Sequence, residues 1–135
     1  MKEIIATAAA PPALGAYAQA VKVNNMVFVS GQLPMDPRSG ELVGGSIARQ
    51  TERVLLNLQS ILMEAEASFD DVVKVTIYLQ NMDYRDEVNK TYAMFFKDLP
   101  PARTTVEVSR LPYDAPLEMD AIAVISGGYT DVDSY

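Results

Sequence analysis

The sequence predicts an α+β fold in which two helices cover one face of a six-stranded mixed sheet. Six short segments are rich in β-branched or alternating apolar residues, and two longer segments carry apolar residues at helical spacing. The helical segments flank one strand, with further strands before and after them, which is typical of an α+β layer. The 135 residues, 49% of them hydrophobic, are enough for one domain with a hydrophobic core.

The N-terminal part predicts three strands. A short strand is expected at residues 2–6, and residues 19–32 predict a hairpin whose two arms carry alternating valines. Asn24-Asn25 separate the arms and tolerate the left-handed conformation of a tight turn. Residues 34–45 are rich in Pro, Gly and Asp, so we expect a loop there.

Residues 46–67 predict the first helix, with Ser46 as its N-cap. The apolar stripe at helical spacing consists of Ile47, Val54, Leu55, Leu58, Ile61, Leu62 and Ala65. The residues that fall off this stripe are Arg49, Glu52, Arg53 and Asn57. The helix is therefore expected to be amphipathic.

A strand and a second helix follow. Residues 72–79 alternate as in a strand with one buried face, and the inward residues are expected to be Val73, Val75, Ile77 and Leu79. Asp83 is expected to cap the segment YRDEVNKTYAMFFK, whose apolar residues recur at helical spacing. Pro100-Pro101 then stop the helix.

Two strands, at residues 103–109 and 117–125, close the fold. The helix between the fourth and fifth strands predicts that these two run parallel. Two helices on one face leave the other face of the sheet open. Because Met26, Met119 and several β-branched residues lie on these strands, a solvated face is unfavourable, and we predict an oligomer.

Composition limits the chemistry that the chain can perform. The net charge is −7 with 11 basic residues, so nucleic acid is not expected as the main ligand. The absence of His and Cys removes the commonest general base and the thiolate nucleophile, leaving carboxylates, Arg, Lys, Tyr, hydroxyls and backbone amides. No apolar run reaches the roughly 18 residues that span a bilayer, and the N-terminus lacks a signal-peptide pattern. We expect a cytoplasmic protein with no membrane partner.

Arg103 stands directly behind the Pro-Pro turn, at the start of a predicted strand. Glu107 shares its face, but four residues at ~3.3 Å each place their backbones about 13 Å apart, so the two are poor partners. Two interpretations stay open. Arg103 forms an ion pair with a carboxylate of another strand or subunit, or its planar fork of donors binds the carboxylate or phosphate of a small ligand.

Glu118 and Asp120 share one face of the last strand. That face is either a solvated edge or it carries a carboxylate that positions and activates water. If the last two strands formed a hairpin, Glu118 would pair near Val108, about 16 Å from Arg103. One small ligand could not contact both. Either the strands are not neighbours, or the two groups meet across a subunit boundary.

Four weaker signals complete the candidates. Tyr17 lies in a Gly/Ala loop and is either a surface anchor or a lid over a pocket. Ser30 and Gly31 end the third strand, where a glycine allows close approach of a ligand or another chain. Asn89 is offset from the apolar stripe of the second helix, so it is either solvated or directed into a groove.

Six segments carry a resemblance to a known family. They are LGAYAQAV, VFVSGQLPMDPRSGELV, VKVTIYLQNM, VNKTYAMFF, PPARTTVEVSRLP and LEMDAIAV. In order and spacing they resemble the RidA/YjgF family of reactive-intermediate deaminases, over roughly residues 4–125. The resemblance implies a chorismate-mutase-like fold, a homotrimer around a central β-barrel, three clefts between subunits, and no cofactor.

The resemblance also implies an activity and a set of site residues. The reaction is hydrolysis of 2-imino acids of the 2-iminobutanoate type, or of enamines such as 2-aminoacrylate, to 2-oxo acids and ammonia. By resemblance, Arg103 binds the substrate carboxylate, Glu118 holds the attacking water, and Tyr17 of a neighbouring subunit closes over the ligand. The residues implied to line the pocket are Ser30, Gly31, Asn89 and Thr105.

Three features depart from the family pattern. Thr105 stands where close relatives often have Cys, and Ala16 stands where Pro is usual, which leaves Tyr17 less rigidly held. Residues 127–135 form an acidic tail that we expect to be mobile. Two other functions stay open: a trimeric protein that binds small carboxylates or partner proteins without turnover, and a ribonuclease or translation inhibitor, which the charge disfavours.

Overall fold

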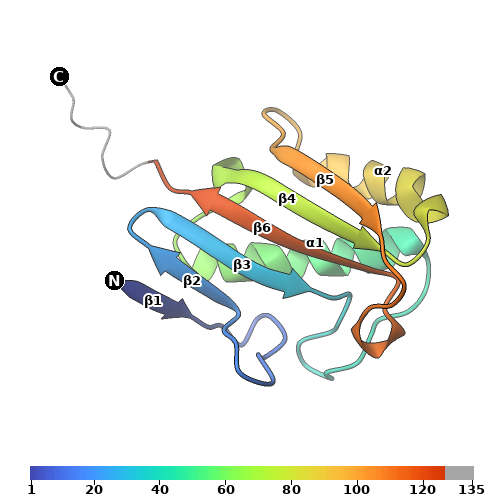
Figure 1. Cartoon of the computed structure of the whole chain (residues 1–135), viewed down its shortest axis with the longest axis horizontal. Helices are drawn as coiled ribbons and strands as arrows, with labels where there is room; N and C mark the ends of the chain where they lie inside the picture. Colours follow the sequence, from blue (N-terminus) through green and yellow to red (C-terminus); the bar gives the residue numbers. More distant parts are fainter. Residues whose placement is uncertain (127–135) are drawn as a thin grey trace.

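A computed structural model describes residues 1–126, in which a six-stranded sheet packs against two helices (Figure 1). The strands are β1 (Lys2–Ile5), β2 (Ala20–Val23), β3 (Met26–Gln32), β4 (Val72–Leu79), β5 (Ala102–Glu107) and β6 (Leu117–Val124). The helices are α1 (Ile47–Glu64) and α2 (Arg85–Phe95), with short 3-10 turns η1 (Phe69–Asp71), η2 (Met82–Tyr84) and η3 (Pro112–Asp114). The tail predicted to be mobile, residues 127–135, lies outside the described residues.

The strand order is β1-β2-β3-β6-β4-β5. β4 and β5 are parallel and are joined by α2, whereas the other neighbouring strands are antiparallel. The predicted α+β fold with a six-stranded mixed sheet is therefore confirmed, as is the parallel connection. β4 lies between β5 and β6, so the last two strands are not hairpin neighbours.

Both helices lie on the same face of the sheet, behind the strands in Figure 1. The predicted apolar stripe of α1 is buried against the sheet, and β6 contributes Ala121 and Ala123, whose small side chains let the helix approach closely. Ser46 is the N-cap, because its Oγ accepts a hydrogen bond from the Arg49 N–H at 3.1 Å. No helix within residues 1–126 has the length and apolarity to cross a membrane.

Two features of the helices differ from the sequence pattern. Asn57 is fully buried although it lies off the apolar stripe, because its side-chain amide donates to the carbonyls of Leu33 and Met35 at 3.1 and 3.0 Å. Asp83 does not cap α2, since it lies within η2, and the Asn81 side chain accepts a hydrogen bond from its N–H at 2.8 Å. Asn57 therefore ties the loop after β3 to α1, and a separate turn precedes α2.

Two strand predictions also need correction. The register of β4 shifts between Val72 and Lys74, so Val72 is buried and Val73 is 47% exposed. Such a bulge reverses the side-chain alternation at one point. Met119 is fully buried on the helix side of the sheet, so it does not belong to the open face.

The open face nevertheless carries an apolar patch. Its residues lie opposite one another on β2, β3 and β6, and they are Val21, Val23, Met26, Phe28, Ile122 and Val124. Met26 and Phe28 are each 38% exposed. The expectation of an oligomer therefore rests on this patch and not on Met119.

Candidate functional site

Arg103 lies on β5, at the edge of the sheet. In the parallel register it pairs with Val75, a buried residue of β4 that faces the helices, so Arg103 points to the helix side. There its guanidinium carbon lies 4.8 Å from the centroid of the Tyr92 ring on α2. Arg103 is an exposed residue. Its guanidinium therefore lies beside an aromatic ring and is not shielded from solvent.

No carboxylate within residues 1–126 forms an ion pair with Arg103. The two ion pairs of this region join Lys22 to Glu66 and Arg110 to Asp114. Glu107 instead accepts a hydrogen bond from the Met82 N–H at 2.7 Å, which confirms that it is a poor partner for Arg103. An ion pair to another strand of the described chain is thus excluded.

Glu118 lies on β6, on the open face of the sheet. It pairs with Tyr78 of β4, and its neighbours along the strand point into the core. The register of β3 shifts between Val29 and Gln32, which places Gly31 against the Glu118 carboxylate. A Cβ at Gly31 would overlap the carboxylate oxygen, so only glycine leaves room for Glu118 in this position.

The surroundings of Glu118 favour its protonated form. Burial raises the pKa of the Glu118 carboxyl above its usual value, and the nearby charge of Asp120 raises it further. Tyr78 donates its hydroxyl to Asp120 Oδ2 at 2.9 Å, and that bond is the main cause of the raised pKa of Tyr78. Asp120 is thus fixed beside Glu118. A carboxylate with a raised pKa is a stronger proton acceptor than an ordinary carboxylate.

Gly31, which lies against Glu118, shares a pocket with Tyr17. A pocket of about 320 Å³ is lined by Tyr17 and Gly31, together with residues of the loop after β3 and of η3. The Ser30 hydroxyl donates to the Ala18 carbonyl at 2.6 Å, which ties the loop that carries Tyr17 to β3. Tyr17 is 56% exposed, and its hydroxyl accepts a 3.3 Å hydrogen bond from the Leu14 N–H.

Asn89 and Thr105 lie with Arg103. Thr105 is two residues beyond Arg103 on β5, so both point to the helix side, and it is partly buried. Asn89 is three residues before Tyr92 on α2, which places the two on one side of the helix. The predicted residues therefore form two groups. The first contains Arg103, Thr105 and Asn89, and the second contains Tyr17, Ser30, Gly31 and Glu118.

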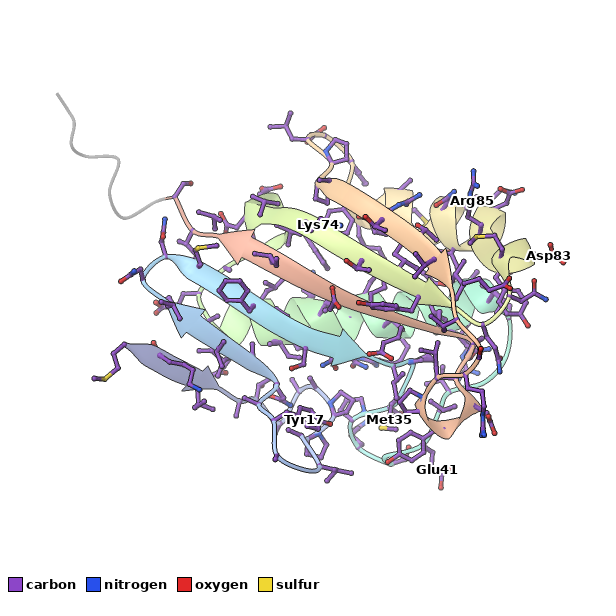
Figure 2. The ribbon with its side chains drawn as sticks, viewed as in Figure 1. Tyr17, Met35, Glu41, Lys74, Asp83 and Arg85 are labelled. Carbon is purple, nitrogen blue, oxygen red and sulfur yellow. The ribbon has the colours of Figure 1, made fainter. Side chains whose placement is uncertain are left out.

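The two groups are far apart in one chain. Arg103 pairs with Val75 of β4, and Val75 pairs with Ala121 of β6. Glu118 is three residues from Ala121, so it lies about 10 Å from Arg103 across the strands and about 10 Å from it along the strand direction. The groups also lie on opposite faces of the sheet. In Figure 2, Tyr17 is near one edge of the molecule and Arg85 of α2 is near the other. A single small ligand cannot contact both groups of the same chain.

Sequence reasoning missed Tyr92 and the Tyr78–Asp120 pair as parts of these groups. Tyr92 fits the apolar stripe of α2 and was expected only in the core, because no local pattern indicates which strand covers its ring. The bond from Tyr78 to Asp120 depends on the pairing of β4 with β6, which are far apart in the sequence. The only sequence signal for a role of Asp120 is that it shares one face of the last strand with Glu118.

The fold and these two groups define a class of small α+β protein with one sheet face packed on helices and the other open. The family model described as Endoribonuclease L-PSP matches residues 7–125. The chain belongs to this family, which is also the RidA/YjgF family.

Relatives and a solved structure agree with this membership. A RutC family protein of Pyrococcus abyssi is 52% identical over 90% of this chain and 96% of its own length. The human 2-iminobutanoate/2-iminopropanoate deaminase is 40% identical over 92% of this chain and 90% of its own. The crystal structure of E. coli TdcF with bound serine has a TM-score of 0.88 and 38% identity, over 92% of this chain and 99% of that one.

Proposed function

We propose that the protein hydrolyses 2-imino acids, and the enamines in equilibrium with them, to 2-oxo acids and ammonia. The observation that carries this proposal is Arg103, whose fork of donors has no carboxylate partner within residues 1–126. The substrates are of the 2-aminoacrylate and 2-iminobutanoate type. The name of the human relative and the serine in the TdcF structure support ligands of this size and charge. The protein would act in the cytoplasm, beside pyridoxal-phosphate enzymes that release such intermediates.

The site is proposed to lie between subunits of a homotrimer. Arg103 of one subunit and Glu118 of the next would then reach the same ligand, although they lie on opposite faces of the sheet in one chain. The apolar patch on the open face supports this assembly, because an isolated subunit exposes Met26 and Phe28 to water. In the cleft Tyr17 would close over the ligand, with Ser30, Gly31, Asn89 and Thr105 along its walls.

The proposed mechanism needs no cofactor. Arg103 binds the substrate carboxylate through two parallel hydrogen bonds and so fixes the position of the imine carbon. Glu118 takes a proton from a water molecule as the water oxygen bonds to that carbon. The C=N electron pair moves to the nitrogen, which takes up that proton to give a carbinolamine. Glu118 then accepts the proton of the new hydroxyl and passes it to the nitrogen, so the C–N bond breaks as the C=O bond forms, and ammonia and the 2-oxo acid leave. The imine carbon is already electrophilic, so orientation and a held base supply most of the acceleration.

The activity is expected to fall at acid pH, with a midpoint above that of an ordinary glutamate. The base form of Glu118 is required, and its raised pKa means that protonation begins at a higher pH. Asp120→Asn removes the neighbouring negative charge, so the midpoint of kcat/KM against pH should move down. It should stay above the ordinary value because Glu118 remains half-buried. An unchanged midpoint in this variant would contradict the proposed influence of Asp120.

A second candidate is a trimeric protein that binds small carboxylates without turnover. The serine bound in the TdcF structure supports it, since that protein holds a small carboxylate. Binding of a carboxylate by Arg103 would serve either function. A ribonuclease role is disfavoured, because a net charge of −7 opposes binding to a phosphate backbone.

A coupled assay separates these functions. A threonine dehydratase generates 2-iminobutanoate, and the rate of 2-oxobutanoate formation is followed with and without the protein. We expect the protein to raise this rate above spontaneous hydrolysis in proportion to its concentration. If it binds 2-oxobutanoate in calorimetry but leaves the rate unchanged, the enzyme proposal fails and the binding function stands.

A further inference from the structure

Tyr92 forms the surface on which Arg103 lies. The Tyr92 side chain is only 6% exposed, and its ring packs against Phe96, with centroids 4.6 Å apart and planes tilted by 33°. The guanidinium carbon of Arg103 is 4.8 Å from the ring centroid, inside the ~6 Å range of a cation–π interaction. The core therefore fixes the ring, and the ring is placed to orient the guanidinium.

The contact leaves the charge of Arg103 available. Burial raises the pKa of the Tyr92 hydroxyl to about 12, although the charge of Arg103 and the closeness of its guanidinium to the hydroxyl act in the opposite direction. Tyr92 is therefore neutral at physiological pH and does not cancel the charge of the arginine. A carboxylate in the same place would neutralise the guanidinium and occupy the donors that a ligand needs.

The hydroxyl of Tyr92 makes no hydrogen bond within residues 1–126, although it is buried. An unpaired buried hydroxyl does not stabilise the fold, so it gives no structural reason to prefer Tyr over Phe here. The contact with Arg103 depends on the ring face. Phe at this position should therefore preserve the contact, whereas an aliphatic residue should abolish it.

We propose that Tyr92 is a positioning residue for the Arg103 clamp, and that its ring face orients the guanidinium without occupying its donors. This inference rests on the proposed role of Arg103 in binding the substrate carboxylate. In this arrangement a residue of α2 orients the guanidinium of a residue on β5. It also explains how an exposed arginine at a sheet edge can keep one orientation without an ion pair.

Binding of 2-oxobutanoate, measured by calorimetry, tests the inference. Tyr92→Phe should keep the wild-type Kd within about twofold, and Tyr92→Leu should raise Kd about two- to fivefold, the loss expected for an exposed cation–π contact. Phe69→Leu is the matched control, because it removes the Phe69 contacts with Phe95 and Phe96 but leaves Phe96 packed on Tyr92 and the Arg103 contact in place. It should lower the melting temperature and leave Kd unchanged. In an Arg103→Ala background, Tyr92→Leu should have no further effect.

A second readout does not depend on ligand binding. A ring face beside the guanidinium shifts the Arg103 side-chain resonances upfield in NMR spectra. This shift should be present in the wild type and Tyr92→Phe and absent in Tyr92→Leu. An Arg103 shift that survives in Tyr92→Leu overturns the inference, as does an equal rise of Kd in Phe69→Leu. If the wild type fails to bind 2-oxobutanoate while the shift behaves as expected, the proposed function fails and the contact with Tyr92 stands.

Discussion

Arg103→Lys is expected to lower kcat/KM for imine hydrolysis by about 10- to 100-fold, although it keeps the positive charge. An ammonium group cannot donate two parallel hydrogen bonds to one carboxylate, and it stacks less well on the Tyr92 ring. Losing one hydrogen bond to a charged group costs about 1.5–3 kcal/mol, which corresponds to this range of rates. The coupled dehydratase assay measures the effect.

Arg110→Lys is the matched control for this variant. Arg110 is an exposed arginine whose ion pair with Asp114 spans 3.1 Å at the surface, and lysine can replace it there. Its activity should stay at the wild-type value. Thermal unfolding should show that both variants are folded. Near-normal kinetics for Arg103→Lys would mean that Arg103 has a structural role only.

Glu118→Gln is expected to lower kcat by about 100-fold or more, while the Kd for 2-oxobutanoate changes little. Glutamine has the same shape, so it can occupy the space that Gly31 leaves, but it cannot take a proton from water. General base catalysis contributes about 10²–10⁴-fold in enzymes, which sets the scale of the loss. Stopped-flow measurement of turnover and calorimetry of binding separate the two effects.

Glu52→Gln serves as the control here, since Glu52 is an exposed carboxylate on α1. It should leave both kcat and Kd unchanged. Equal turnover by Glu118→Gln and the wild type would remove Glu118 from the mechanism. A large rise in Kd with unchanged kcat would instead make Glu118 a binding residue.

Local patterns in the sequence were enough to predict the helices and most of the sheet. The N-cap role of Ser46 follows from the residue preferences at helix N-termini, and the parallel pairing of β4 and β5 follows from the helix between them. The structure differs from these patterns where distant segments decide the outcome. Asn57 is buried because the loop after β3 offers it two carbonyls, and Val73 is exposed because a bulge shifts β4.

The residues of the candidate site could be proposed from the sequence, but their division into two groups could not. Spacing shows that Arg103 and Glu118 are far apart if their strands form a hairpin. It does not show that β4 lies between β5 and β6, nor that the two side chains lie on opposite faces of the sheet. That separation depends on the order and register of the whole sheet. It is also the observation on which the proposed intersubunit site rests.

The central claim is that each site combines Arg103 of one subunit with Glu118 of another. Mixing two inactive variants, Arg103→Ala and Glu118→Gln, tests it directly. In a trimer containing both, one of the three clefts receives an intact Arg103 from one chain and an intact Glu118 from its neighbour. Random assembly of equal amounts makes about three quarters of the trimers mixed, so about one quarter of the wild-type activity should return.

The measurement is the coupled-assay rate of trimers co-assembled from the two variants, each with a different affinity tag, and purified through both tags. Every such trimer should have about one third of the wild-type activity, while each variant alone stays inactive. Doubly tagged trimers that show no more activity than the separate variants would contradict the account, because both residues would then have to come from the same chain.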